Sequence, residues 1–124
     1  MSTKILIVDD EAELPQIIKD YLGDETDFEI DLVFSGEKGL ECINKFQPDI
    51  CIVDMRLPRM NGNEFILKAH DKLPDCKFVI HTGSIDYFIP PELSQIGMTD
   101  ESIVYKPVLD LSEFSNKIRK LLQL

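Results

Sequence analysis

The stretch ILIVDDE (residues 5–11) runs from four branched aliphatic residues directly into three carboxylates. Its aliphatic part is apolar at every position, so both faces of a strand would be buried, as is typical of a central strand in a parallel sheet. Asp9, Asp10 and Glu11 need water or a cation, so we expect them where this strand leaves the core. The stretch therefore predicts a central β-strand that ends at a polar site.

Further short apolar runs alternate with segments of helical spacing. Strands are expected at KILIVD (4–9), FEIDLVF (28–34), DICIVD (49–54), KFVIHT (77–82) and SIVYK (102–106). Asn61 with Glu64, and Asp110 with Glu113, have the spacing of capping boxes that would open the third and the last helix. Between these helices, Pro90 and Pro91 allow only a short or broken fourth helix.

This alternation predicts an α/β fold with a doubly wound, five-stranded parallel sheet and about five helices. FEIDLVF begins with strict apolar–polar alternation, which favours an edge strand, whereas ILIV and ICIV suit central strands. The expected strand order is 2-1-3-4-5, the flavodoxin-like arrangement, in a single domain over residues 1–124. In such a sheet, ligands bind at the carboxyl ends of the strands, between the first and the third.

Composition excludes several classes of function. The chain has 124 residues and a net charge of −10, so its surface repels nucleic acid and direct binding to DNA or RNA is not expected. The apolar runs are far shorter than the roughly 20 residues that a membrane span needs, so we expect no membrane insertion. Three cysteines without CxxC spacing fit reduced thiols, and we expect a cytoplasmic protein.

Acidic residues fall at the ends of two neighbouring central strands. Asp9 and Asp10 end the first, and Asp54 ends the third. Such a group of carboxylates needs a cation, and hard oxygen ligands without histidine or cysteine favour Mg²⁺. Lys106, at the end of the fifth strand, is a candidate for a second neutralising charge.

Each of these residues also has a plainer interpretation. Asp9 and Asp10 could cap a helix, Asp54 could serve a turn, and Lys106 could be a solvated surface lysine. Thr82, at the end of the fourth strand, could bond only to backbone. His81 is expected to be a partly buried strand residue whose ring is hydrogen-bonded.

The stretches IVDDE, IVDMRLPRMNG, HTGS and YKP together resemble the receiver domains of two-component response regulators, such as those of chemotaxis. Their order and spacing match over essentially the whole chain. The resemblance implies that Asp54 accepts a phosphoryl group from a sensor histidine kinase or a phosphotransfer protein. It also implies a downstream protein target and a monomer or weak dimer. The chemistry would be that of a signalling phosphoacceptor and not of a conventional enzyme.

The resemblance also assigns roles to individual residues. Asp10, Asp54 and the backbone carbonyl of Arg56 would bind Mg²⁺ directly, and Asp9 would act through water. Thr82 would hydrogen-bond a phosphoryl oxygen, and Lys106 would pair with it. The peptide bond between Lys106 and Pro107 would be cis.

The chain departs from the family pattern at Ile103, where receivers usually carry a Tyr or Phe that moves when Thr82 is recruited; here the aromatic residue is Tyr105. An alternative function is therefore a receiver-like interaction module that is not phosphorylated. A second alternative is a phosphatase of the haloacid-dehalogenase type. Asp54-Met55-Arg56 argues against it, because that family needs a second acid two residues after the nucleophile.

Overall fold

The computed structural model of this chain describes residues 2–24 and 27–124. Within them, five parallel strands form one sheet in the order β2-β1-β3-β4-β5, which confirms the predicted topology. The strands are β1 (Thr3–Val8), β2 (Phe28–Val33), β3 (Ile50–Asp54), β4 (Lys77–Thr82) and β5 (Ile103–Tyr105). Residues 5–8 of β1 and all of β3 are buried, and these two strands lie next to each other, with β2 at an edge, as their hydrophobic patterns indicated.

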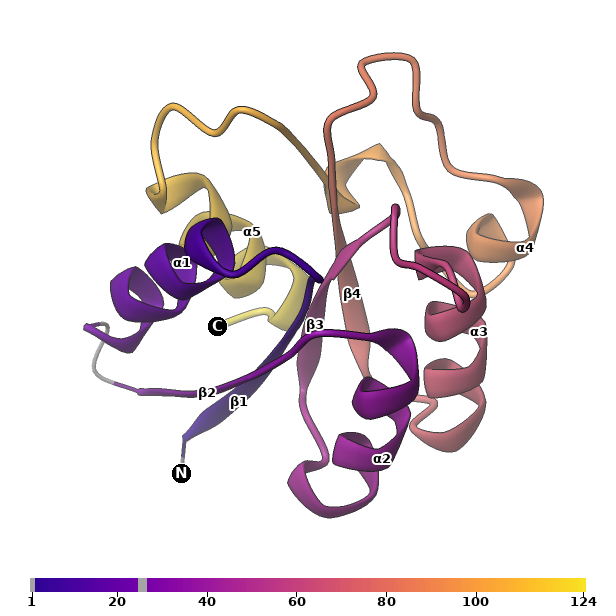
Figure 1. Cartoon of the computed structure of the whole chain (residues 1–124), viewed down its shortest axis with the longest axis horizontal. Helices are drawn as coiled ribbons and strands as arrows, with labels where there is room; N and C mark the ends of the chain where they lie inside the picture. The colour runs from indigo at the N-terminus through magenta and orange to yellow at the C-terminus, as the bar shows by residue number, and fades with distance from the viewer. Residues whose placement is uncertain (1, 25–26) are drawn as a thin grey trace.

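Helices cover both faces of this sheet (Figure 1). The described α-helices are α1 (Glu13–Gly23), α2 (Gly36–Phe46), α3 (Gly62–Lys72), α4 (Pro91–Ser94) and α5 (Ser112–Leu122), and a 3-10 helix spans Asp100–Ser102. On one face, α1 and α5 pack over Ile5 and Ile7 of β1; on the other, α2 and α3 pack over Leu6 and Val8. Alternate residues of one strand thus belong to two cores, because successive side chains point to opposite faces of a sheet.

The helix starts agree only partly with the sequence patterns. The Asn61 side chain accepts a hydrogen bond from the Glu64 backbone N–H (3.0 Å), as predicted for the start of α3. The capping role predicted for Asp110 is wrong, because its carboxylate instead accepts from both the N–H and the hydroxyl of Ser112 (2.9 and 2.7 Å). Ser112 offers two donors two residues away, so Asp110 closes a turn just before α5 begins.

The fourth helix is short, as predicted. It spans only Pro91–Ser94, with Pro90 in an extended conformation before it. Pro91 is tolerated because it occupies the first turn, where its missing N–H would have no helical partner. No described helix has the length and apolar character to span a bilayer.

Candidate functional site

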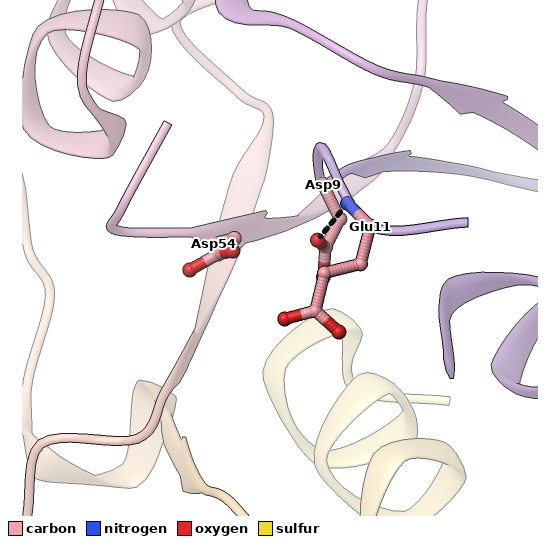
Figure 2. Close-up of side chains that lie close together, drawn as sticks. All are labelled: Asp9, Glu11 and Asp54. Carbon is pink, nitrogen blue, oxygen red and sulfur yellow. Dashed lines mark hydrogen bonds between the residues drawn. The ribbon is translucent and has the colours of Figure 1, made fainter. Parts of the chain in front are cut away.

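Three carboxylates meet at the carboxyl ends of β1 and β3 (Figure 2). Asp9 follows β1 directly, Asp54 is the last residue of β3, and the pairing of Val8 with Val53 brings the two strand ends side by side. One carboxylate oxygen from each of Asp9, Glu11 and Asp54 lies within 4.8 Å of the other two. Asp9 and Asp54 are only 2% and 5% exposed, so this negative charge lies largely within the protein.

Backbone N–H groups hold one oxygen of each buried carboxylate. Oδ1 of Asp9 accepts a hydrogen bond from the N–H of Glu11 (3.0 Å), the contact drawn in Figure 2. Oδ1 of Asp54 accepts one from the N–H of Arg56 (3.1 Å). These bonds fix the orientation of both side chains and leave the second oxygen of each available to other groups.

Lys106 brings a positive charge to the same place. Its Nζ atom lies 3.7 Å from Oδ2 of Asp54 and 4.0 Å from Oδ2 of Asp9. It lies closest to Glu11, 3.5 Å from Oε1. One ammonium group thus faces three carboxylates, and an excess of negative charge remains.

The pKa of Asp9 reflects its burial first and this excess of negative charge second. Burial raises the pKa of its carboxyl from 3.8 to about 6, and the charges of Asp54 and Glu11 add to the rise. The hydrogen bond from the Glu11 backbone and the charge of Lys106 oppose it. The site as it stands therefore favours a further cation or a bound proton.

Thr82 is the last residue of β4 and is 2% exposed. Its hydroxyl accepts a hydrogen bond from the N–H of Ser84 (3.2 Å), and its carbonyl oxygen accepts one from the N–H of Lys106 (2.8 Å). The β4–β5 pairing sets Thr82 beside Tyr105, and the β3–β4 pairing sets Asp54 beside His81. Thr82 therefore lies one residue further along its strand than the level of Asp54, at the same end of the sheet.

The carboxylates that lie close to Asp54 are only partly those that the sequence predicted. The cluster within the described residues contains Glu11, whereas the Asp10 side chain is exposed and lies outside it. Arg56 is exposed and contributes its N–H to Asp54. Direct metal binding by Asp10 and by the Arg56 carbonyl stays a prediction. Glu11 is the third acid of the run that begins at Asp9. The run alone does not predict that the chain bends so that Glu11, and not Asp10, joins the cluster.

The predictions for the Lys106–Pro107 peptide bond and for the His81 ring have different outcomes. The Lys106–Pro107 peptide bond is cis, as the resemblance implied. The prediction of a hydrogen-bonded His81 ring is wrong for one of its nitrogens, since Nε2 is buried without a partner among the described residues. The ring instead packs edge-on against Phe114, with centroids 5.0 Å apart.

The donor set fits a hard divalent cation. Its atoms are carboxylate oxygens, and the described cluster contains no histidine or cysteine. Mg²⁺ typically binds a few carboxylates and keeps several of its waters. A cation at Asp9 and Asp54 would also remove the repulsion that contributes to the raised pKa of Asp9.

Comparison with known proteins decides the family. The family model of the response regulator receiver domain matches residues 5–119. The chain belongs to this family. It is a receiver domain of the kind found in two-component response regulators. Its strand order and its helices agree with those of receiver structures.

Solved receiver domains have the same fold. The REC domain of AraT, a response regulator from Geobacillus stearothermophilus, superposes with a TM-score of 0.83 at 27% identity, covering 99% of this chain and 95% of that one. A CheY-like receiver domain protein from Methanospirillum hungatei gives a TM-score of 0.81 at 28% identity, covering 99% and 96%.

Curated relatives are much longer than this receiver domain. The regulatory protein VanR of Enterococcus faecium is 39% identical over 72 residues, which are 58% of this chain and 31% of VanR. A protein-glutamate methylesterase/protein-glutamine glutaminase of Paramagnetospirillum magneticum is 32% identical over 106 residues, 85% of this chain and 30% of that protein. The chain thus matches less than a third of the length of either relative.

Proposed function

We propose that this receiver domain is phosphorylated on Asp54 and relays the signal of a sensor histidine kinase or phosphotransfer protein to a downstream protein. One observation carries the proposal: Oδ1 of Asp54 is held by the Arg56 N–H, while Oδ2 lies 3.7 Å from the Lys106 ammonium. One oxygen is therefore fixed, and the other is positioned beside a cation that can neutralise an incoming phosphoryl group.

The transfer joins the free oxygen of Asp54 to phosphorus. As this O–P bond forms, the bond from phosphorus to the imidazole nitrogen of the donor phosphohistidine breaks. The imidazole leaves with the electron pair and takes up a proton, and Asp54 becomes an aspartyl phosphate. Such a transfer needs alignment and charge neutralisation more than acid–base chemistry.

The chain supplies both requirements. Lys106 pairs with a phosphoryl oxygen. The Thr82 hydroxyl turns away from the Ser84 N–H, from which it accepts a hydrogen bond, and donates one to a phosphoryl oxygen. Asp9, Asp10, Asp54 and the Arg56 carbonyl are the residues proposed to hold Mg²⁺. When bound, the ion neutralises charge on the phosphoryl group. The buried positions of Asp9 and Asp54 keep bulk water from one side of the site.

The proposal extends to the setting of the domain. Residues 1–124 act as one receiver domain in the cytoplasm, as a monomer or weak dimer, without contact to nucleic acid. The alternative, an interaction module that does not take up phosphate, has Ile103 and the short α4 in its favour. It does not account for a lysine held against a buried aspartate at the end of the central strand.

An intact-mass measurement distinguishes the two. The protein is incubated with acetyl phosphate with and without Mg²⁺, alongside Asp54→Asn and the control Asp71→Asn, which changes an exposed aspartate of α3. We expect the wild type and the control to gain the mass of one phosphoryl group only with Mg²⁺, and Asp54→Asn to gain none. Equal labelling of Asp54→Asn would move the acceptor elsewhere, and no labelling of the wild type would favour the interaction module.

A further inference from the structure

The Lys106 ammonium has a resting partner that the phosphorylation chemistry does not use. Its closest carboxylate is Glu11, 3.5 Å away, and not Asp54 at 3.7 Å or Asp9 at 4.0 Å. The Lys106 side chain is 19% exposed and that of Glu11 is 55% exposed. The pair therefore lies at the mouth of the site, with the lysine on its inner side.

The position of Glu11 is fixed from within the site. The Asp9 carboxylate accepts the Glu11 N–H at 3.0 Å, so the buried aspartate holds the backbone from which Glu11 reaches toward Lys106. Figure 2 shows the Glu11 carboxylate beside Asp9 and Asp54, and one oxygen of each lies within 4.8 Å of the other two. Glu11 thus completes a chain of contacts that runs from the end of β1 to the residue after β5.

We propose that Glu11 is a positioning residue that holds Lys106 in the unphosphorylated state and competes with the phosphoryl group for it. This inference rests on the proposed function. When Asp54 carries a phosphoryl group, Lys106 exchanges the Glu11 carboxylate for a phosphoryl oxygen. The released Glu11 then faces an anion, and its exposed side chain is free to turn toward water.

The exchange sets a threshold for activation. A partner of Lys106 in the resting state stabilises that state alone, so it lowers the affinity of the site for a phosphoryl group or its analogue. Repulsion between Glu11 and the incoming anion acts in the same direction. Because the pair is half-exposed, we expect the effect on affinity to be about two- to fivefold.

Three variants separate this role from a general effect of charge. Glu11→Gln keeps the size of the side chain and removes its charge. Glu11→Asp keeps the charge but withdraws it from Lys106 by one methylene. Glu13→Gln, at the exposed start of α1, makes the same change in net charge two residues away and is the matched control.

The first readout needs neither metal nor phosphate. In Mg²⁺-free buffer, the NMR signals of the Lys106 side-chain Cε and its protons report the contact. We expect them to shift in Glu11→Gln and Glu11→Asp and to stay at the wild-type position in Glu13→Gln. Unshifted signals in both Glu11 variants would show that the ion pair is absent in solution and would overturn the inference.

The second readout is the affinity for beryllium trifluoride, an analogue of the phosphoryl group, at Mg²⁺ saturating for each variant. We expect Glu11→Gln to bind it about two- to fivefold more tightly than the wild type and Glu13→Gln, and we expect the affinity of Glu11→Asp, which keeps the negative charge, to lie between those of the wild type and Glu11→Gln. Equal or weaker binding by Glu11→Gln would overturn the competition while leaving phosphorylation of Asp54 intact. If the wild type itself fails to bind the analogue, the proposed function falls, and the competition falls with it.

Discussion

The Tyr105 hydroxyl donates a hydrogen bond to the backbone carbonyl of Tyr87, 3.2 Å away, and so ties the end of β5 to the loop that follows β4. Tyr105 is the register partner of Thr82. On the other side of the loop, the Tyr87 hydroxyl donates to the Asn63 side chain of α3 (3.5 Å). The loop after Thr82 is therefore held from both sides by tyrosine hydroxyls. Position 103, where receivers usually carry an aromatic residue, is a buried isoleucine and makes neither of these hydrogen bonds.

We expect activation to rearrange residues 83–98 without a side-chain swing at Ile103. When Thr82 turns to a phosphoryl oxygen, its bond to the Ser84 N–H is lost, and the Tyr105 contact carries the change to β5. Hydrogen exchange with and without beryllium trifluoride and Mg²⁺ measures this. Identical exchange and backbone NMR shifts over residues 83–98 in the two states would contradict the prediction.

Tyr105→Phe tests the tether itself. Loss of one partly exposed hydrogen bond should cost about 0.5–1 kcal/mol of local stability, which would speed amide exchange in residues 84–89 by about two- to fivefold. Tyr21→Phe, a half-buried tyrosine of α1, is the control. Unchanged exchange in Tyr105→Phe would mean that the loop is held by other contacts.

Arg56 should slow the loss of the phosphoryl group. Its side chain is exposed and begins two residues after Asp54, so its guanidinium can steady the phosphoryl charge and hinder water. We expect Arg56→Asn to shorten the lifetime of the aspartyl phosphate by about two- to fivefold, the range for an exposed charge pair. The decay of the phosphorylated mass after removal of acetyl phosphate gives the rate.

Arg59→Asn is the matched control, because Arg59 lies in the same loop with a positive φ of 62°, a conformation that asparagine tolerates. A decay rate in Arg56→Asn equal to that of this control would show that the Arg56 side chain only faces water.

Magnesium should bind at the ends of β1 and β3. We expect millimolar Mg²⁺ to shift the NMR signals of Asp9 and Asp54, and Asp10→Asn or Asp54→Asn to weaken binding about tenfold or more, the scale for loss of a group around a metal. Glu13→Gln should leave the affinity near that of the wild type. A normal affinity in Asp10→Asn would remove Asp10 from the ligands, and unmoved signals in the wild type would argue against the site.

His81 should make the fold sensitive to acid. Burial, with a smaller contribution from the Lys106 charge, lowers the pKa of its imidazole from 6.5 to about 4. Between these values the unfolded chain binds the proton and the folded protein does not, so stability falls as the pH drops from 6.5 toward 4. The loss attributable to His81 is at most about 3 kcal/mol.

His81→Phe keeps an aromatic ring against Phe114 and removes the buried nitrogen that has no partner among the described residues. We expect it to raise stability at pH 7 by about 1 kcal/mol and to reduce the acid-induced loss, as measured by urea unfolding at pH 5 and pH 7. The control is His70→Asn in the last turn of α3. An unchanged difference between the two pH values in His81→Phe would contradict the assignment to His81.

The sequence was sufficient for the fold because its apolar runs are strongly patterned. The patterns of ILIV and ICIV indicated central strands, and that of FEIDLVF indicated an edge strand. Asn61 marked the start of α3, because its side chain accepts a hydrogen bond from the Glu64 N–H. Asp110 failed as a cap because Ser112 offered competing donors. Such competition depends on local backbone geometry, which residue spacing does not contain.

The sequence predicted which residues at the strand ends lie at the candidate site, but it did not predict the contribution of the loop after β1. Asp9, Asp54 and Thr82 follow from strand order alone, because parallel strands end at the same edge. Glu11 could not be found in this way, since its contact with Lys106 depends on how the chain turns after β1. The unpartnered nitrogen of His81 likewise depends on side-chain packing, which the strand pattern does not reveal.

The most direct test of phosphorylation at Asp54 is to trap the acyl phosphate chemically. After reaction with acetyl phosphate and Mg²⁺, borohydride reduces an aspartyl phosphate to homoserine, and peptide mass spectrometry locates the converted residue. We predict homoserine at position 54 and nowhere else, and none when Mg²⁺ is omitted. Conversion at another aspartate, or an unmodified residue 54, would contradict the proposed function.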